Sequence, residues 1–247
     1  MSLLGRLLGR QRARWDESWQ TYPGTVADAP ALWTVDLGAV DAAPVAAMPF
    51  RLDIIVPYPA DSAGLPSGHL ADAEAAVRTE VDSLGGVYLG RIASRARCRF
   101  TAHLPAEPSG PITVAEPPGV EVLVAYDPHW AYVRDSLAPD ERQARLLADR
   151  AVLDALAEQG DRLATARPLA HVAFFAEPAL AEDAAVALRA DGFIADVEPD
   201  GEGDYALTAV RSDPVAPPGV HELTWSVQEI VERYGGTYDG WTCAVEP

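Results

Sequence analysis

The C-terminal third of the chain alternates short apolar strands with amphipathic helices, and this order constrains the fold more than any other feature. Residues 169–176 and 193–197 have strand character, and the segment between them, 178–191, begins with a proline and ends before a glycine, as helices do. A turn at 200–203 leads to a strand at 205–210, an amphipathic helix at 219–235 and a last strand at 237–245. The order β-α-β-β-α-β predicts a ferredoxin-like α/β sandwich over residues 167–247.

The preceding part of the chain is less regular but also mixes both element types. We expect strands at 31–37 and 50–56, a helix at 69–84, a hairpin of 87–95 with 97–104, a strand at 120–126 and a helix at 140–159. The proline-rich stretch 105–119 predicts an internal loop, and residues 1–14 form a basic N-terminal tail. The fold class is therefore α+β, with a first α/β sandwich domain at 15–166, which includes the helix at 140–159, and a second at 167–247.

The charge of the chain is strongly acidic and unevenly distributed. Its 19 basic residues are all arginine and face 37 acidic residues, which gives a net charge of −18. Residues 168–247 alone hold 15 acidic residues and 3 arginines. Such a surface argues against nonspecific DNA binding, which requires cations to replace counterions, and fits a basic protein partner. With two cysteines and no apolar run of membrane-spanning length, we expect a cytoplasmic protein that does not bind membranes.

Familiar catalytic motifs are missing from the sequence. His221-Glu222 begins like a zinc-peptidase motif, but Trp225 stands where the second histidine is needed. The absence of lysine excludes a Walker lysine and a Schiff base. Cys98 and Cys243 are too far apart in sequence for a zinc ribbon. We therefore predict a protein that is not an enzyme and has no metal and no cofactor.

Five histidines are scattered without ligand spacing, and His171 is the notable one because it lies inside an apolar strand. Surface or hydrogen-bonded structural roles explain such residues in most proteins. The alternative is an enzyme with a pocket between the domains, in which His171 or His129 would act with nearby carboxylates.

The hairpin of the first domain is rich in arginine. Strand alternation places Arg97 and Arg99 on one face, opposite Cys98, Phe100 and Ala102. One interpretation is a site for anions or RNA, and the other is a solvated sheet face paired with acidic neighbours such as Glu74, Glu80 and Asp82. The candidate anion-binding residues are Arg91, Arg95, Arg97 and Arg99.

The C-terminal run Gly235-Gly236-Thr237-Tyr238-Asp239-Gly240-Trp241 resembles the closing motif of the regulator of ribonuclease E activity B (RraB) family. The resemblance covers about residues 160–247 and departs from the family pattern after the motif, where Thr242 and Cys243 follow. It implies a ferredoxin-like domain that inhibits ribonuclease E by binding it. Features that agree upstream are Gly160-Asp161, Arg167-Pro168, His171, Phe174-Phe175 and Gly192-Phe193.

The first domain resembles a bacterial family of unknown function, number 695 among such domains. The resemblance brings no activity with it. The residues that carry it are Trp19, Tyr22, Gly64-Leu65-Pro66, Gly90-Arg91, Asp127, Trp130 and Tyr132.

Together these observations predict a regulatory, protein-binding module whose acidic domain docks on an arginine-rich surface of an RNA-processing partner. The expected contact residues are Tyr238, Asp239, Trp241, Glu229 and Glu232, with the two aromatic side chains either partly exposed as anchors or packed at the end of the sheet. An immunity-type protein that neutralises a basic nuclease toxin remains an alternative, as does the enzyme described above. The sequence leaves the oligomeric state open.

Overall fold

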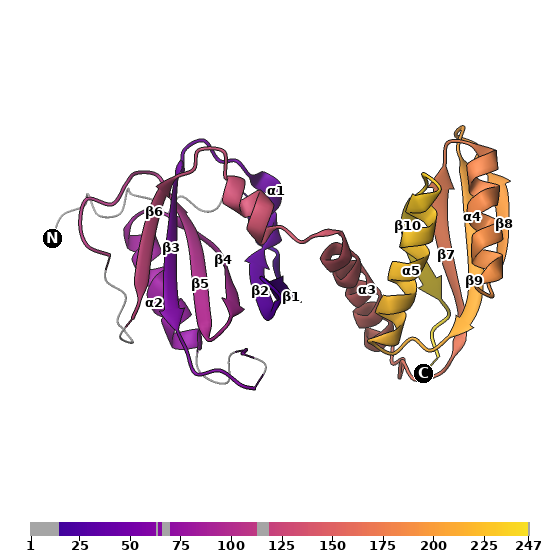
Figure 1. Ribbon diagram of the computed structural model, residues 1–247, viewed down its shortest axis with the longest axis horizontal. Coiled ribbons are helices and arrows are strands. Elements are labelled where there is room, and N and C mark those ends of the chain that lie inside the picture. The colour runs from indigo at the N-terminus through magenta and orange to yellow at the C-terminus, as the bar shows by residue number, and fades with distance from the viewer. Residues whose placement is uncertain (1–14, 63, 66–69, 113–118, 247) are drawn as a thin grey trace. The chain divides into compact units, whose positions relative to one another are not determined.

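The computed structural model describes residues 15–62, 64–65, 70–112 and 119–246, and the chain divides into two compact units (Figure 1). Unit 1 is Met1–Asp140 and unit 2 is Glu141–Pro247. The basic tail predicted at 1–14 and part of the proline-rich loop, 113–118, lie outside the described residues. Both units combine helices with a single sheet, so the predicted fold class, two α/β domains, is confirmed.

Unit 1 contains a six-stranded sheet in the order β1-β2-β4-β5-β3-β6, with every neighbouring pair antiparallel. Its helical segments are α1 (Leu37–Ala42), α2 (Leu70–Ser83) and η2, a π-helical turn (Val133–Leu137). Its strands are β1 (Trp19–Val26), β2 (Ala29–Asp36), β3 (Phe50–Pro57), β4 (Val87–Ser94), β5 (Arg97–Leu104) and β6 (Glu121–Tyr126).

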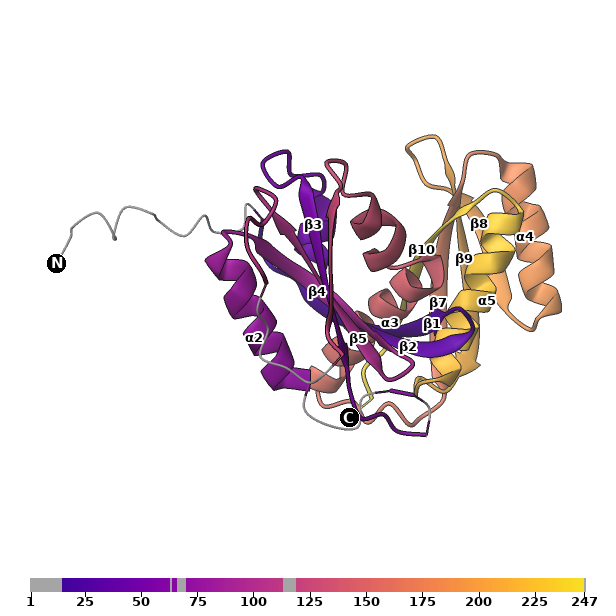
Figure 2. The same cartoon turned by 60° about the vertical axis from the view of Figure 1, so that its left-hand side comes forward.

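Helix α2 covers one face of this sheet (Figure 2). Its buried residues Leu70, Val77 and Val81 recur at helical spacing and pack against Leu52 of β3 and Phe100 of β5. Cys98, Phe100 and Ala102 of β5 belong to the same cluster, so alternate residues of this strand point at α2.

The opposite face of the same sheet is covered in part by η2 and the turn before it. The Tyr22 hydroxyl donates a hydrogen bond to the carbonyl of Leu137, and Trp33 Nε1 donates to the carbonyl of Ser136 at 2.9 Å. Trp130 stacks on His103, with ring centroids 4.2 Å apart. Aromatic residues from distant parts of the sequence thus fix this second layer.

Unit 2 contains a four-stranded antiparallel sheet in the order β10-β7-β9-β8, with α4 and α5 side by side on one face (Figure 1). Strand β9 lies between β7 and β8, so the β7-α4-β8 unit is split. From β7 onward the elements follow the predicted order β-α-β-β-α-β. The elements are α3 (Glu141–Glu158), β7 (Arg167–Phe175), α4 (Pro178–Ala190), β8 (Ile194–Pro199), β9 (Tyr205–Asp213), α5 (Gly219–Arg233) and β10 (Thr237–Cys243).

The division between the units differs from the predicted boundary at 166/167, because α3 belongs to unit 2. Leu153 and Leu156 of α3 join the same buried cluster as Leu169 of β7 and Val227 of α5. An apolar stripe shows that a helix has a buried face, but it does not show which sheet the helix packs on. The helix at 140–159 was for this reason assigned to the wrong domain.

Candidate functional site

The motif Gly235–Trp241 joins the end of α5 to β10, and each of its three glycines has a structural reason. Gly235 adopts φ +76° just beyond α5, in the left-handed conformation that ends many helices. A Cβ on Gly236 would lie 2.4 Å from the ring of Phe175, so only glycine fits there. Gly240 adopts φ +126° within a strand irregularity. The glycines therefore set the path of β10 along β7.

A β-bulge at Asp239-Gly240 brings the two aromatic residues of the motif to one face of the sheet. Tyr238 pairs with Ala173 and Trp241 with His171, so Asp239 and Gly240 together take the place of one residue. Without the extra residue, the positions of Tyr238 and Trp241 would face opposite sides. The Asp-Gly pair was a signal for a turn or bulge, and the bulge is confirmed.

The carboxylate of Asp149 on α3 is the centre of a buried polar network. It accepts hydrogen bonds from Trp241 Nε1 at 2.9 Å and from Thr224 Oγ1 at 2.5 Å. The Nε atom of Arg145 and the Nδ1 atom of His221 each lie 3.2 Å from it. Asp149 itself is fully buried. The network ties α3, α5 and β10 together.

His171 lies in the middle of β7 and is buried beside this network. Its Nδ1 atom is 2.7 Å from the Tyr238 hydroxyl, its ring meets Phe193 edge-on, and Nε2 has no hydrogen-bond partner among the described residues. Burial lowers the pKa of His171 to about 4, helped by the nearby Arg211 and Arg145, while Asp213 opposes the shift. His171 is therefore a neutral core residue at pH 7.

The structure separates the five predicted contact residues into two groups. Trp241 is 7% exposed and belongs to the core, and the half-buried Tyr238 turns its hydroxyl towards His171. Of the two alternatives for Trp241, an exposed anchor or a packed residue, the structure shows the packed one, because the bulge points its ring at the helices. Asp239, Glu229 and Glu232 are exposed, and Glu232 accepts a hydrogen bond from Gln228 Nε2 at 2.7 Å.

Two family models match the chain, and each match lies within one of the two units. Residues 147–243 match the family described as Regulator of ribonuclease activity B (RraB), and residues 17–137 match the Family of unknown function (DUF695). We call unit 1 the DUF695 domain and unit 2 the RraB domain after these two matches. A search of curated proteins gave no match.

The RraB domain is the more acidic of the two. Unit 2 holds 20 acidic residues and 8 arginines, a net charge of −12, whereas unit 1 has a net charge of −6. Several arginines are already paired: Arg142 with Glu222, Arg189 with Glu182 and Arg211 with Asp213. The ion pairs found in the described part of the domain leave Glu229 and Glu232 without an arginine partner. The exposed face of α5 thus carries two acidic residues outside these ion pairs, with the exposed Arg233 beside them.

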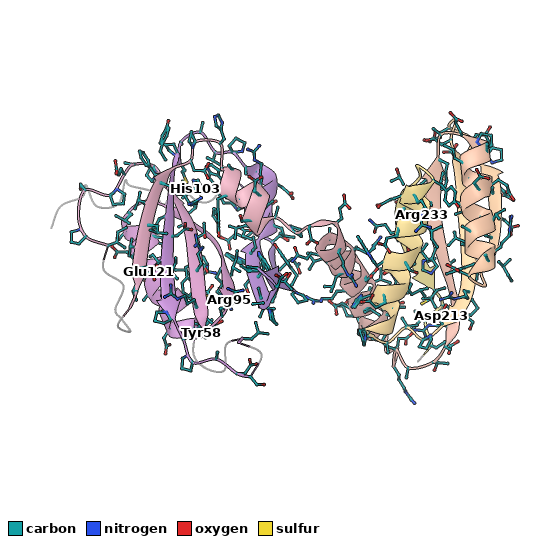
Figure 3. All side chains as sticks on the ribbon, in the orientation of Figure 1. Tyr58, Arg95, His103, Glu121, Asp213 and Arg233 are labelled. Carbon is teal, nitrogen blue, oxygen red and sulfur yellow. The ribbon has the colours of Figure 1, made fainter. Side chains whose placement is uncertain are left out.

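The four hairpin arginines of the DUF695 domain do not form one patch. Arg91 lies on the α2 side and its Nε atom is 3.0 Å from Glu74, as one interpretation of the sequence expected. Arg95 is at the hairpin turn (Figure 3), where it donates to the carbonyl of Ala27. Arg97 pairs with Glu121 at 2.6 Å. Arg97 and Arg99 do share a face opposite Cys98, as predicted, but acidic neighbours compensate them.

Asp53, which the sequence did not single out, collects the polar groups on that face. Its buried carboxylate lies 3.2 Å from Arg99 and 3.1 Å from Arg51, and it accepts a hydrogen bond from Thr101 at 2.9 Å. The ring of Tyr132 lies against both guanidinium groups. Arg99 is therefore held within a structural network. The pairing register of β3 with β5 brings these residues together, and no spacing in the sequence predicts this cluster.

The two histidines of the enzyme alternative lie in different units and differ in burial. His171 is enclosed in the RraB core, whereas His129 is exposed in the DUF695 domain. No cluster of three or more histidine, cysteine or acidic residues that could bind a metal occurs within the described ranges. No helix of the described chain is long and apolar enough to span a membrane.

Proposed function

We propose that the RraB domain regulates a ribonuclease by docking its acidic surface on an arginine-rich segment of that enzyme. The observation that carries the proposal is the match of residues 147–243 to a family described as a regulator of ribonuclease activity. The excess of 20 acidic residues over 8 arginines in unit 2 supports the expected chemistry of the partner. We further propose that the protein acts in the cytoplasm and without a catalytic step of its own.

The contact residues we propose are Glu229 and Glu232 on α5 and Asp239 at the bulge of β10. All three are exposed, and α5 contacts β10 directly. Carboxylates bind guanidinium groups by charge-assisted hydrogen bonds, and uncompensated negative charge steers a basic partner at long range. In this scheme Trp241 has a positioning role, because it fixes the strand that carries Asp239. Tyr238 has a similar role through its contacts with His171 and Arg145.

Inhibition follows if the arginines that the RraB domain occupies are those that bind RNA. A guanidinium group that pairs with a carboxylate no longer binds a phosphate, so RNA and the RraB domain compete for the same residues. The inhibition should therefore depend on RNA concentration and weaken as salt screens the charges.

Capture of ribonuclease E from the same genome by the full-length chain tests this proposal. We expect E229R/E232R to weaken capture at low salt by about tenfold or more, since buried or central charge pairs dominate such interfaces. The matched control is D196R/E198R, which changes the net charge equally on β8, where both acids are exposed. Equal losses in both variants would overturn the assignment to α5, and full capture by E229R/E232R would overturn the electrostatic mechanism.

A further inference from the structure

A groove of about 530 Å³ runs between α3 and the C-terminal part of β10 in the RraB domain. Residues of α3 form one wall and residues of β10 with the segment after it form the other. The described residues that line it are Ala151, Val152, Ala155, Leu156, Gln159, Trp241, Thr242, Cys243 and Val245. The lining is mostly apolar, with Gln159 and Thr242 as its polar side chains, and it includes no residue of α5.

The groove follows the edge of β10 rather than one face of the sheet. Trp241, Thr242 and Cys243 are consecutive, so their side chains alternate between the two faces, and a groove that touches all three must run beside the strand. β10 is the edge strand of the order β10-β7-β9-β8, and no other described strand pairs with its outer side. Such an edge presents backbone donors and acceptors to an incoming chain.

Short side chains keep the groove open on the α3 wall. Ala151 and Ala155 are one turn apart and both exposed, and they face the groove where a longer residue would fill it. Val152, Leu156 and Val245 contribute larger apolar side chains to the lining. The space suits apolar side chains that project from an extended chain at every second position.

Three acidic residues are neighbours in sequence of residues that line the groove. Glu158 follows Ala155 by three positions on α3, and Asp154 follows Ala151 by three, so both lie beside the alanine wall. Glu246 comes directly after the lining residue Val245. All three acidic residues are exposed. An apolar groove with carboxylates along its rim is complementary to a segment that combines apolar residues with arginines.

We propose that this groove binds an extended, arginine-containing segment of the partner protein, which adds a fifth strand at the β10 edge. Apolar side chains of the segment enter the groove, arginines reach the rim carboxylates, and main-chain hydrogen bonds form with β10. The proposal rests on the proposed function, since it identifies how the ribonuclease is held. It assigns specificity to the groove and long-range attraction to α5.

Cys243 provides a direct readout of the occupied groove, because it lines the groove while Cys98 is fully buried. The test uses the full-length chain and ribonuclease E from the same genome. Binding should slow the reaction of Cys243 with a maleimide by about tenfold and slow amide hydrogen exchange in residues 237–243. Capture that leaves both rates unchanged would overturn the proposal.

Filling the groove gives the second arm of the test. A155W places a large side chain on the exposed alanine wall, and we expect it to reduce capture by about tenfold. A157W is the matched control, because Ala157 is exposed on α3 but does not line the groove. If E229R/E232R loses capture while A155W and A157W retain it, the groove proposal fails and the proposed function stands. If the unmodified chain captures no ribonuclease E, both fail.

Discussion

The indole Nε1 of Trp241 donates a hydrogen bond of 2.9 Å to Asp149 Oδ1, across 92 positions of the sequence. This bond connects the first helix of the RraB domain to its last strand. Because the same carboxylate also accepts from Thr224 on α5, one buried side chain holds three elements together. The α3 wall of the groove is thereby fixed to β10.

Replacing Asp149 should destabilise the RraB domain strongly. D149A leaves the buried Trp241 N–H without an acceptor and the Arg145 guanidinium without its counter-charge. It also removes the hydrogen bond from Thr224, whose hydroxyl keeps only the carbonyl of His221 as an acceptor, so we expect a loss of about 3–5 kcal/mol in the free energy of unfolding. Urea unfolding with hydrogen exchange read from α3 and β10 measures it. D154A, an exposed change on the same helix, should stay within about 0.5 kcal/mol. Equal behaviour of the two variants would show that the network contributes nothing.

The motif glycine at 236 should tolerate no side chain. Its Cβ would lie 2.4 Å from the buried Phe175 ring, so G236A forces the core to shift, and we expect it to cost about 1–3 kcal/mol. Gly219 at the start of α5 has open space around it, and G219A should be neutral or slightly stabilising. Thermal or urea unfolding of both variants measures the change in stability. A G236A variant as stable as the unmodified chain would contradict the packing argument.

The sequence predicted the elements of the RraB domain well because glycine and proline mark where they end. Pro178 begins α4, Gly235 follows α5, and Asp239-Gly240 signals the bulge, all through local backbone preferences. The role of Asp149 was not predictable in this way. An acid within a helix normally faces solvent, and only the tertiary approach of Trp241 and Thr224 makes it a buried acceptor.

In the DUF695 domain, the sequence analysis did not predict the first strand, because local turn signals conflict with its place in the sheet. Pro23 and Gly24 within Trp19–Val26 indicate a turn, but β1 is the edge strand of its sheet, where proline is tolerated. The sequence also did not predict that the four hairpin arginines lie apart from one another. It depends on the hairpin geometry and on acidic partners from α2 and β6, such as Glu74 and Glu121, which no local pattern joins to the hairpin.

The stability of the RraB domain should decrease as the pH is lowered, and His171 should be one cause of this decrease. The pKa of His171 is about 4 in the folded chain, below its ordinary value of 6.5, so the unfolded chain binds the proton first as the pH falls. Between pH 6.5 and pH 4 the folded state therefore loses free energy relative to the unfolded state, by up to about 3 kcal/mol. The charged groups that act on His171 are Asp213, which is labelled in Figure 3, and the two arginines Arg211 and Arg145.

H171Q removes the titrating group at this position and is the control for this prediction. Its unfolding free energy should change less than that of the unmodified chain between pH 6.5 and 4, although its stability at pH 7 should be lower because the packing against Phe193 and Tyr238 is altered. Urea unfolding at several pH values gives both curves. Parallel curves would show that other groups cause the acid sensitivity.

The two cysteines should differ sharply in reactivity, and this difference is what makes Cys243 usable as a probe. Cys98 is fully buried in the DUF695 core, and burial raises the pKa of its thiol to about 12. Its modification must wait for opening of that core, so we expect it to react about a thousandfold more slowly than Cys243, which lines the open groove. Reaction of the native chain with a chromogenic disulfide should show one fast thiol and a second only in denaturant. C243S should abolish the fast phase, and C98S should leave the fast phase unchanged. A fast phase that survives C243S would show that Cys98 is the accessible thiol, which would contradict the packing of β5 under α2.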